Sequence, residues 1–569
     1  MYDQALQTPP SRMRAFLDGQ QNQKGAEAPL TRFTVAAILV FCVFLAIGIR
    51  LLWVMVLSQP HSRASTPELP LLKRSDIVDR NGTILATNLI TFSLFANPKH
   101  ISDPQLVAKK LTKIFPEMSE KSLSQKLTSQ SPFVWIKRNL TPKQKLMVQY
   151  LGQVGLDFQK EQKRIYPHET LTAHVVGYTN VDNKGLTGVE RHFESSLKTG
   201  DKPLQLSIDL RVQHILREAL VNGAEKYGAK KASGIVLDAN TSEILGMVSL
   251  PDFDPHHSKT SEAIFNTNTL GVYEMGSVFK IFTFAMALDY KVVSLQDGFD
   301  TSKPFHVGKF RISDLYPKNR WLSIPEIFMY SSNIGTVRTA LKVGAKRQKE
   351  FFEKIGFLKP LKIELGENGV PMAPRGEWKD INMATISYGY GLAISPLHLT
   401  NGIATLVNGG VLRNPTLLKK EGADTYTRII SAATSEKMRR LMHLVVKSGS
   451  GQKANAVGYM VGGKTGSANK KVEGGKGYVA KGKHRAIFVG AFPITSPRYL
   501  VFIMLDEPKN GGAAGGISTG GAVAAPIAKE VIEKAASLLE VMPVDETSPA
   551  IQSAMRIQQE GRGATRAIQ

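Results

Sequence analysis

The hydrophobic residues of the chain are concentrated first in one uninterrupted stretch near the N-terminus. Phe33 to Ile49 carries no charge, and Leu51 to Leu57 extends the stretch past Arg50. A helix of this length and composition can span a bilayer. The hydrophobic core of a signal peptide is shorter, at roughly 7 to 15 residues, and no small-residue cleavage site follows here. The pattern therefore predicts an uncleaved transmembrane helix over residues 33–57, preceded by a polar segment at 1–32.

The polar and apolar positions after this helix change period several times. A hairpin is predicted at Asp76–Ala86, where Asn81-Gly82 supplies the turn. The pattern becomes helical at 103–149 and returns to short strands and glycine turns at 164–193. We find no convincing chemistry in this block and expect residues 58–203 to form an elongated supporting domain.

A second pattern begins at residue 204 and runs to residue 540. Strand-like runs open and close it, and helical runs fill its centre, so we expect an α+β domain in which helices sandwich a sheet. The predicted strands are 204–209, 233–238, 244–249, 457–464, 484–491 and 500–505, and the principal helices are 211–227, 279–288 and 522–539. Residues 541–569 have little apolar pattern and are predicted to be disordered.

Composition narrows the class of protein further. The 569 residues are 42% hydrophobic and 21% charged, which is ordinary for a globular protein, but the formal net charge is +24. Such a charge suits an anionic lipid or acidic polymer as a partner. The sequence has no zinc-knuckle spacing or basic–aromatic stacking pattern, so a nucleic-acid partner is not expected. The single cysteine, Cys42, lies in the apolar stretch, so no intramolecular disulfide can form.

Three short motifs carry the candidate chemistry. They are Ser277-Val278-Phe279-Lys280, Ser331-Ser332-Asn333 and Lys464-Thr465-Gly466-Ser467. A serine hydroxyl becomes a good nucleophile when a nearby base removes its proton. A lysine three residues later on a helix lies on the same face as the serine. Together the motifs predict a serine acyl-transfer site that uses no histidine.

The Ser/Lys spacing alone does not identify the nucleophile. It recurs at Ser195 and Lys198, at Ser450 and Lys453, and at Ser467 and Lys470. Ser277 differs because Gly276 precedes it as a turn and the apolar run 279–288 follows it as a buried helix. A serine at the positive end of this helix is placed where negative charge develops favourably. The context therefore favours Ser277.

With these motifs in order, the chain resembles the class B penicillin-binding proteins, in particular the division-specific FtsI type. The resemblance extends from about residue 74 to residue 529. It rests on the three motifs and on the segments Ile77–Gly82, Ala173–Asp182, Tyr273–Ser277, Gly520-Gly521 and Ala524–Pro526. Two positions depart from the family pattern: Met275 replaces a proline, and Ser75 stands where glycine is common. Both concern backbone turns.

The resemblance implies a peptidoglycan D,D-transpeptidase that cross-links stem peptides of the septal wall and is a target of β-lactams. Ser277 would attack the D-Ala-D-Ala donor, and Lys280 would be the base, its pKa lowered by burial and by the Lys464 charge. Ser331 would relay a proton, and Asn333 would hold a substrate amide. The donor carboxylate would be recognised by Lys464, Thr465 and Ser467, in the motif completed by Gly466. The backbone N–H groups of Ser277 and Ser467 would form the oxyanion hole.

The same resemblance implies the partners and the location. The expected partners are peptidoglycan stem peptides, the lipid-linked precursor, β-lactams, a membrane glycosyltransferase and other division proteins. No cofactor or metal is expected, and His256-His257 is interpreted as an exposed pair. The chain would be a single-pass protein of the bacterial inner membrane, with residues 1–32 cytoplasmic, a pedestal at 58–203 and a periplasmic catalytic domain at the septum. Two alternatives remain: a D,D-carboxypeptidase or β-lactamase-like hydrolase, and a non-catalytic division scaffold.

Overall fold

The computed structural model describes residues 28–53, 55, 74–200, 202–257, 260–422, 425–470, 483–509 and 518–557. The chain divides into two units, residues 1–71 and 72–569. Most of the tail expected at 1–32 and the first residues of the supporting domain, 58–73, lie outside the described residues.

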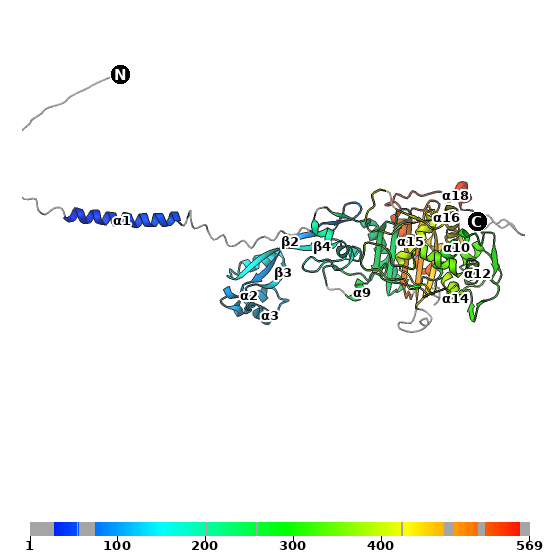
Figure 1. Cartoon of the computed structure of the whole chain (residues 1–569), viewed down its shortest axis with the longest axis horizontal. Coiled ribbons are helices and arrows are strands. Elements are labelled where there is room, and N and C mark those ends of the chain that lie inside the picture. Colours follow the sequence, from blue (N-terminus) through cyan, green and yellow to red (C-terminus); the bar gives the residue numbers. More distant parts are fainter. Residues whose placement is uncertain are drawn as a thin grey trace, which may run out of the picture. The chain divides into compact units, whose positions relative to one another are not determined.

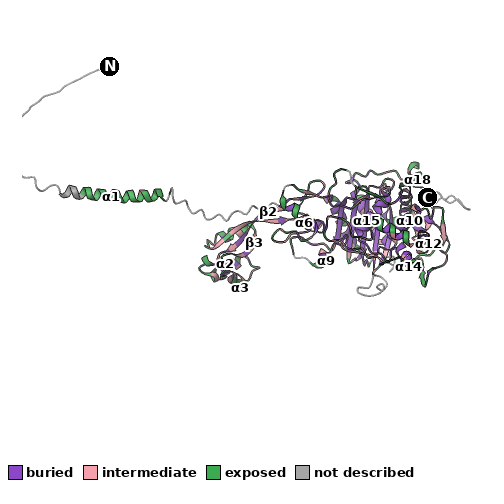
Figure 2. Cartoon of the chain, viewed as in Figure 1, coloured by how far each residue is buried: buried purple, intermediate pink, exposed green. Residues whose placement is uncertain are grey.

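The described part of the first unit consists mainly of the helix α1 (Ala28–Leu52) (Figure 1). Its segment Phe33–Leu52 has a mean hydropathy of 2.8 and is long and apolar enough to cross a membrane. From Phe33 onward, nearly all side chains of α1 are exposed (Figure 2). An exposed apolar helix of this length agrees with the transmembrane segment predicted from the sequence.

The N-terminal part of the second unit is built on a five-stranded sheet. The order is β3-β2-β1-β5, and β4 pairs with β2. The predicted hairpin is present, because β1 pairs antiparallel with β2 through Val78 and Ile84. The strands are β1 (Ile77–Val78), β2 (Ile84–Ala96), β3 (Val134–Leu140), β4 (Leu156–Ile165) and β5 (Leu204–Gln205). The helices are η2 (Pro98–His100), α2 (Pro104–Ile114), α3 (Glu120–Leu127), α4 (Pro142–Gln149), η3 (Glu169–Thr172), α5 (Ala173–Val176), α6 (Gly188–His192) and α7 (Glu194–Thr199).

A buried ion cluster ties distant segments of this region together. The Glu190 carboxylate accepts hydrogen bonds from Arg74 Nε at 2.6 Å and from Arg164 Nε at 2.7 Å. All three side chains are at least 97% buried. A second carboxylate, Glu194, accepts from Arg74 at 2.8 Å but is partly exposed. The cluster therefore joins β4, α6 and the start of the region around one fully buried carboxylate.

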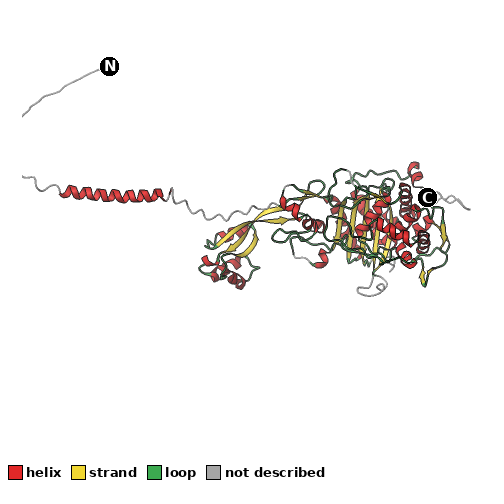
Figure 3. Ribbon diagram, in the orientation of Figure 1, coloured by secondary structure: helices red, strands yellow, loops and turns green. Residues whose placement is uncertain are grey.

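The C-terminal domain is organised around an antiparallel sheet with the order β14-β15-β16-β6-β7. Helices cover both faces (Figure 3), which confirms the α+β sandwich predicted from the sequence. The strands of the domain are β6 (Lys231–Asp238), β7 (Ile244–Leu250), β8 (Gly298–Asp300), β9 (Phe305–Val307), β10 (Phe310–Ile312), β11 (Trp321–Ser323), β12 (Val411–Leu412), β13 (Thr427–Arg428), β14 (Gly462–Asn469), β15 (His484–Phe492) and β16 (Tyr499–Asp506).

Alternate residues of the sheet enter two separate hydrophobic clusters. Ile487 and Val489 of β15 belong to one cluster, and Phe488 belongs to the other, as the two-residue period of a strand requires. The first cluster includes residues of α10, α15 and α16, and the second includes residues of α8 and α17. The helices are α8 (Leu210–Tyr227), α9 (Ser261–Ile264), η4 (Gly276–Phe279), α10 (Lys280–Asp289), α11 (Ile324–Tyr330), α12 (Asn333–Val343), α13 (Ala345–Lys354), α14 (Asp380–Ser387), α15 (Pro396–Val407), α16 (Ala432–Ser448), η5 (Gln452–Ala454), α17 (Gly520–Ala535) and α18 (Pro549–Met555).

The structure differs from the predicted disordered tail over residues 541–557. Val541 and Ile557 are buried, and α18 lies between them. The Gly458 N–H donates to Glu546 Oε1 at 2.8 Å. This segment docks through single apolar residues rather than through a periodic face, so its pattern carries no helix or strand signal. Residues 558–569 lie outside the described residues.

We predict that Glu190→Gln lowers the thermal unfolding midpoint, because it leaves two buried guanidinium groups without a full counter-charge. Removing one partner of a buried ion pair destabilises a protein by about 3–5 kcal/mol. The matched control is Glu194→Gln, which alters the second carboxylate bound to Arg74; because this carboxylate is partly exposed to water, we expect a smaller drop. Differential scanning fluorimetry of the two variants measures the difference. Equal unfolding midpoints for the two variants would show that burying the Glu190 carboxylate adds nothing to the stability of the protein.

Candidate active site

The first element of the site is the short turn that carries Ser277. The 3₁₀ helix η4 leads directly into α10, so Ser277 and Lys280 stand one turn apart on the same face. Ser277 is half-buried and lines a cleft, whereas Lys280 is completely buried. Both placements agree with the helix predicted after Gly276.

The turn is held by close backbone contacts. Gly276 has a φ of +56°, and Gly389, on the far side of the turn, has a φ of +93°. A Cβ atom on Gly389 would lie 1.9 Å from the Gly276 carbonyl oxygen, a distance that no side chain tolerates. The Gly276 N–H in turn donates to the Gly389 carbonyl at 3.1 Å. The nucleophile turn therefore depends on glycine at position 389.

The second element is the Ser331 turn between α11 and α12. Ser331 adopts a left-handed conformation, with φ 61° and ψ 39°. Lys280 Nζ donates to the Ser331 carbonyl at 2.5 Å, to Ser331 Oγ at 3.1 Å and to Asn333 Oδ1 at 2.8 Å. The Asn333 amide nitrogen also donates to the Ser313 carbonyl at 2.9 Å. The turn thus surrounds the amine of Lys280 with oxygen acceptors.

The third element is the edge strand β14, which runs along the nucleophile turn. A Cβ on Gly466 would lie 2.7 Å from Val278 Cγ2 and 2.9 Å from the Met275 carbonyl, so only glycine permits this approach. Lys464, on the same strand, is completely buried and donates through Nζ to Ser331 Oγ at 3.0 Å. Ser331 Oγ therefore accepts from two buried amines, one from α10 and one from β14.

Burial alters the proton affinity of both amines. The pKa of Lys280 is lowered well below its usual range, first by burial and then by the Lys464 charge, while Asp314 acts in the opposite direction. Burial also lowers the pKa of Lys464 to about 7. A lysine with such a depressed pKa can accept a proton near neutral pH.

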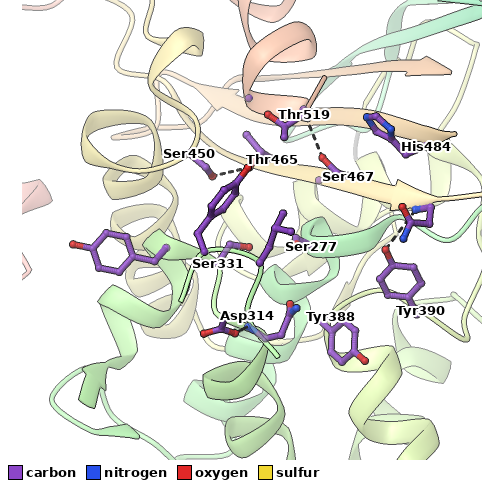
Figure 4. Close-up of a pocket in the computed structure, with 18 residues that line it drawn as sticks. Ser277, Asp314, Ser331, Tyr388, Tyr390, Ser450, Thr465, Ser467, His484 and Thr519 are labelled. Atoms are coloured by element: carbon purple, nitrogen blue, oxygen red, sulfur yellow. Dashed lines mark hydrogen bonds between the residues drawn. The ribbon is translucent and has the colours of Figure 1, made fainter. Parts of the chain in front are cut away.

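The open part of the site is a cleft of about 650 Å³ (Figure 4). Ser277 and Ser331 lie on one side of it, opposite Thr465 and Ser467 of β14. The Ser450 hydroxyl is 2.6 Å from Thr465 Oγ1, and the Gly520 N–H donates to Ser467 Oγ at 3.3 Å. The remaining lining comes from Asp314, Leu315, Tyr316, Tyr330, Asn333, Tyr388, Tyr390, Gly466, Asn469, His484, Thr519, Gly520 and Gly521.

The structure brings together every residue predicted for the site, but two of them are placed differently from their expected roles. Lys464 is buried beneath the cleft lining rather than open to a donor carboxylate, and its amine contacts Ser331. Both polar atoms of the Asn333 amide are bonded within the protein. Thr465 and Ser467 line the cleft as expected.

Several cleft residues were missed by reasoning from sequence. Ser450, one of the serines that share the Ser/Lys spacing, was not predicted for the site, yet it lines the cleft. Asp314 stands outside the three motifs, and no local pattern distinguishes it. Tyr390 lines the cleft and accepts from the Asn469 N–H at 3.4 Å, whereas Trp378 is packed in the core against Phe352.

The site thus has a half-buried serine, Ser277, one helical turn before a buried lysine of lowered pKa, with a second buried lysine and Ser331 beside that lysine. The chain belongs to the penicillin-binding protein family. Residues 232–533 match the penicillin binding protein transpeptidase domain, and residues 72–209 match the penicillin-binding protein dimerisation domain.

Individual relatives support this assignment. The chain is 37% identical over 487 residues to the probable peptidoglycan D,D-transpeptidase FtsI of Caulobacter vibrioides, which covers 82% of each protein. It is 33% identical over 522 residues to the probable peptidoglycan D,D-transpeptidase PenA of Neisseria meningitidis, covering 85% of this chain and 87% of that protein. The crystal structure of penicillin binding protein 3 from Mycobacterium tuberculosis complexed with aztreonam shares the fold. Its TM-score is 0.66 at 22% identity, over 83% of this chain and 97% of that one.

We predict that Gly389→Ala reduces acylation of Ser277 by fluorescent penicillin at least tenfold, because the added methyl group displaces the Gly276 carbonyl. The control is Gly376→Ala, which introduces the same strain at a φ of +71° but meets no atom within 4 Å. Stopped-flow or gel-based labelling of both variants measures the rates. Similar rates in the two variants would show that backbone strain, not contact with Gly276, is responsible.

Proposed function

We propose that the protein is a peptidoglycan D,D-transpeptidase of cell division that acts through an acyl-enzyme on Ser277. One observation carries this proposal: two fully buried amines, Lys280 and Lys464, converge on Ser331 Oγ next to the open hydroxyl of Ser277. The family match and the relatives named as peptidoglycan D,D-transpeptidases support the substrate.

In the first half of the reaction, the Ser277 hydroxyl loses its proton to neutral Lys280 and attacks the penultimate carbonyl of a D-Ala-D-Ala donor. The peptide bond breaks, and the leaving amine of the last D-alanine takes up a proton. Ser331 is suited to carry that proton, because its hydroxyl lies within hydrogen-bond distance of both amines. The products are free D-alanine and an ester on Ser277.

In the second half, the amine of an acceptor stem peptide attacks the ester. The new peptide bond forms the cross-link, the amine gives up a proton, and Ser277 regains one. The hydroxyls of Thr465, Ser467 and Ser450 gather on one side of the cleft, where they suit the carboxylate of the donor. In this proposal Lys464 is buried beneath the lining that these hydroxyls form, and it acts through its hydrogen bond to Ser331 Oγ. The N–H groups of Ser277 and Ser467 are the proposed oxyanion hole.

The proposed setting is the bacterial inner membrane at the division septum. The helix α1 supplies one membrane crossing, and cross-linking substrates lie outside the cytoplasm. The catalytic domain then lies in the periplasm and the N-terminus in the cytoplasm. A membrane glycosyltransferase that polymerises glycan is the proposed partner, together with other division proteins.

We predict that full-length protein in detergent forms a long-lived adduct with fluorescent penicillin, and that Ser277→Ala abolishes it. Lys280→Arg keeps the positive charge but cannot serve as a base, so we expect a loss of at least about 100-fold in the acylation rate. Ser195→Ala is the control and should label normally. Rapid release of hydrolysed drug would indicate a hydrolase, and a folded wild-type protein that does not label would indicate a non-catalytic scaffold.

We further predict the orientation of the chain in the membrane. Protease added to spheroplasts should digest the domains that follow α1 and leave an epitope tag at the N-terminus protected, because α1 separates them. Immunoblots with N-terminal and C-terminal tags measure both ends. Digestion of the N-terminal tag in intact spheroplasts would reverse the assignment.

A further inference from the structure

Asp314 lies outside the three motifs but is bonded to one of them. It follows β10 in the loop that leads to β11, and its carboxylate accepts three hydrogen bonds. Oδ2 accepts from Ser332 Oγ at 2.7 Å, and Oδ1 accepts from the N–H groups of Asn333 at 2.6 Å and Ile334 at 3.0 Å. These donors form the first turn of α12, so Asp314 caps the helix at the point where the Ser331–Asn333 motif enters it.

The segment that Asp314 holds is the one that holds Lys280. Ser331 is in the left-handed region, which a serine adopts only when its surroundings enforce it. The Ser331 carbonyl and Asn333 Oδ1 are two of the three oxygens around Lys280 Nζ, and Ser331 Oγ is the third. A shift of the α12 N-terminus would therefore move all three acceptors away from the amine.

Asp314 also has an electrostatic effect on the same amine. The side chains bonded to Lys280 Nζ are Ser331 and Asn333, which are uncharged. The charged groups that act on the amine are Lys464 from β14 and Asp314 from the loop after β10. Burial and Lys464 lower the pKa of Lys280, and Asp314 raises it. Within the described part of the chain, Asp314 is the one carboxylate among the residues that line the cleft.

We propose that Asp314 is a positioning residue for acylation: it fixes the Ser331–Asn333 turn against Lys280 and supplies a negative charge that acts on the Lys280 amine. This inference rests on the proposed function, since it concerns the base of that reaction. It assigns Asp314 two effects, one through hydrogen bonds and one through charge, which different substitutions can separate.

The test is the pH dependence of penicillin acylation, measured as a second-order rate on full-length protein in detergent. Asp314→Asn keeps the size of the side chain and an oxygen acceptor for the two N–H groups, but it removes the charge. Without that charge Lys280 loses its proton at a lower pH, so the rising limb of the profile should move to lower pH by about 1 unit. The rate on the high-pH plateau should stay within about threefold of wild type.

Asp314→Ala removes the hydrogen bonds as well as the charge. We expect it to show the same shift of the limb and, in addition, a plateau rate at least tenfold lower, because the turn is no longer fixed. The control is Asp300→Asn, which removes the same charge from an exposed carboxylate. Asp300 lies in β8, the strand that pairs with β11. Its profile should match that of the wild type.

An Asp314→Asn profile that coincides with the wild type, or that moves to higher pH, would overturn the electrostatic part of the proposal. A normal plateau in Asp314→Ala would overturn the positioning part. If the alanine variant does not fold, as judged by its thermal midpoint, the plateau of Asp314→Glu decides instead: a longer side chain displaces the turn, and an unchanged rate would overturn the proposal. Failure of the wild-type protein to label would reject the proposed function itself.

Discussion

The structure of the active site depends on the burial of two amines around one hydroxyl. Lys280 and Lys464 are removed from water, and both donate to Ser331 Oγ. Two ammonium groups at one oxygen repel each other, and burial penalises each of them. Burial therefore favours the neutral form of each amine, and it lowers the pKa of Lys464 to about 7. In the proposed mechanism the lowered pKa of Lys280 leaves its amine neutral and able to accept the proton of Ser277.

The fold supplies the rigidity that this arrangement needs. β14 is an edge strand, but its partner β15 belongs to a sheet with a hydrophobic cluster on each face. α10 is buried along nearly its whole length, from Lys280 to Leu288. Packed interiors of this kind deform little. The amines therefore approach the same hydroxyl from two elements that cannot easily move apart, although 184 residues separate them in sequence.

Local sequence signals located several of the main elements. The apolar run after Ser277 marks the buried helix α10, and the apolar runs near residues 487 and 503 mark the buried strands β15 and β16. Residues that act through tertiary contact carry no such signal. β3 was overlooked within a region interpreted as helical because its pairing with β2 decides its conformation. Asp314 and Ser450 enter the site only because loops fold back upon motifs that are distant in the chain.

The lining of the cleft also bears on why transfer should prevail over hydrolysis. A hydrolase on this scaffold needs a base that activates water against the acyl-enzyme. Among the described lining residues, the carboxylate is that of Asp314, and three donors from α12 already occupy its oxygens. The other conventional base is His484, whose Nε2–H donates to the Ser518 carbonyl at 2.7 Å. In the proposed mechanism Lys280 is therefore the base beside an ester on Ser277, and an incoming amine, which is a better nucleophile than water, gives its proton to that lysine.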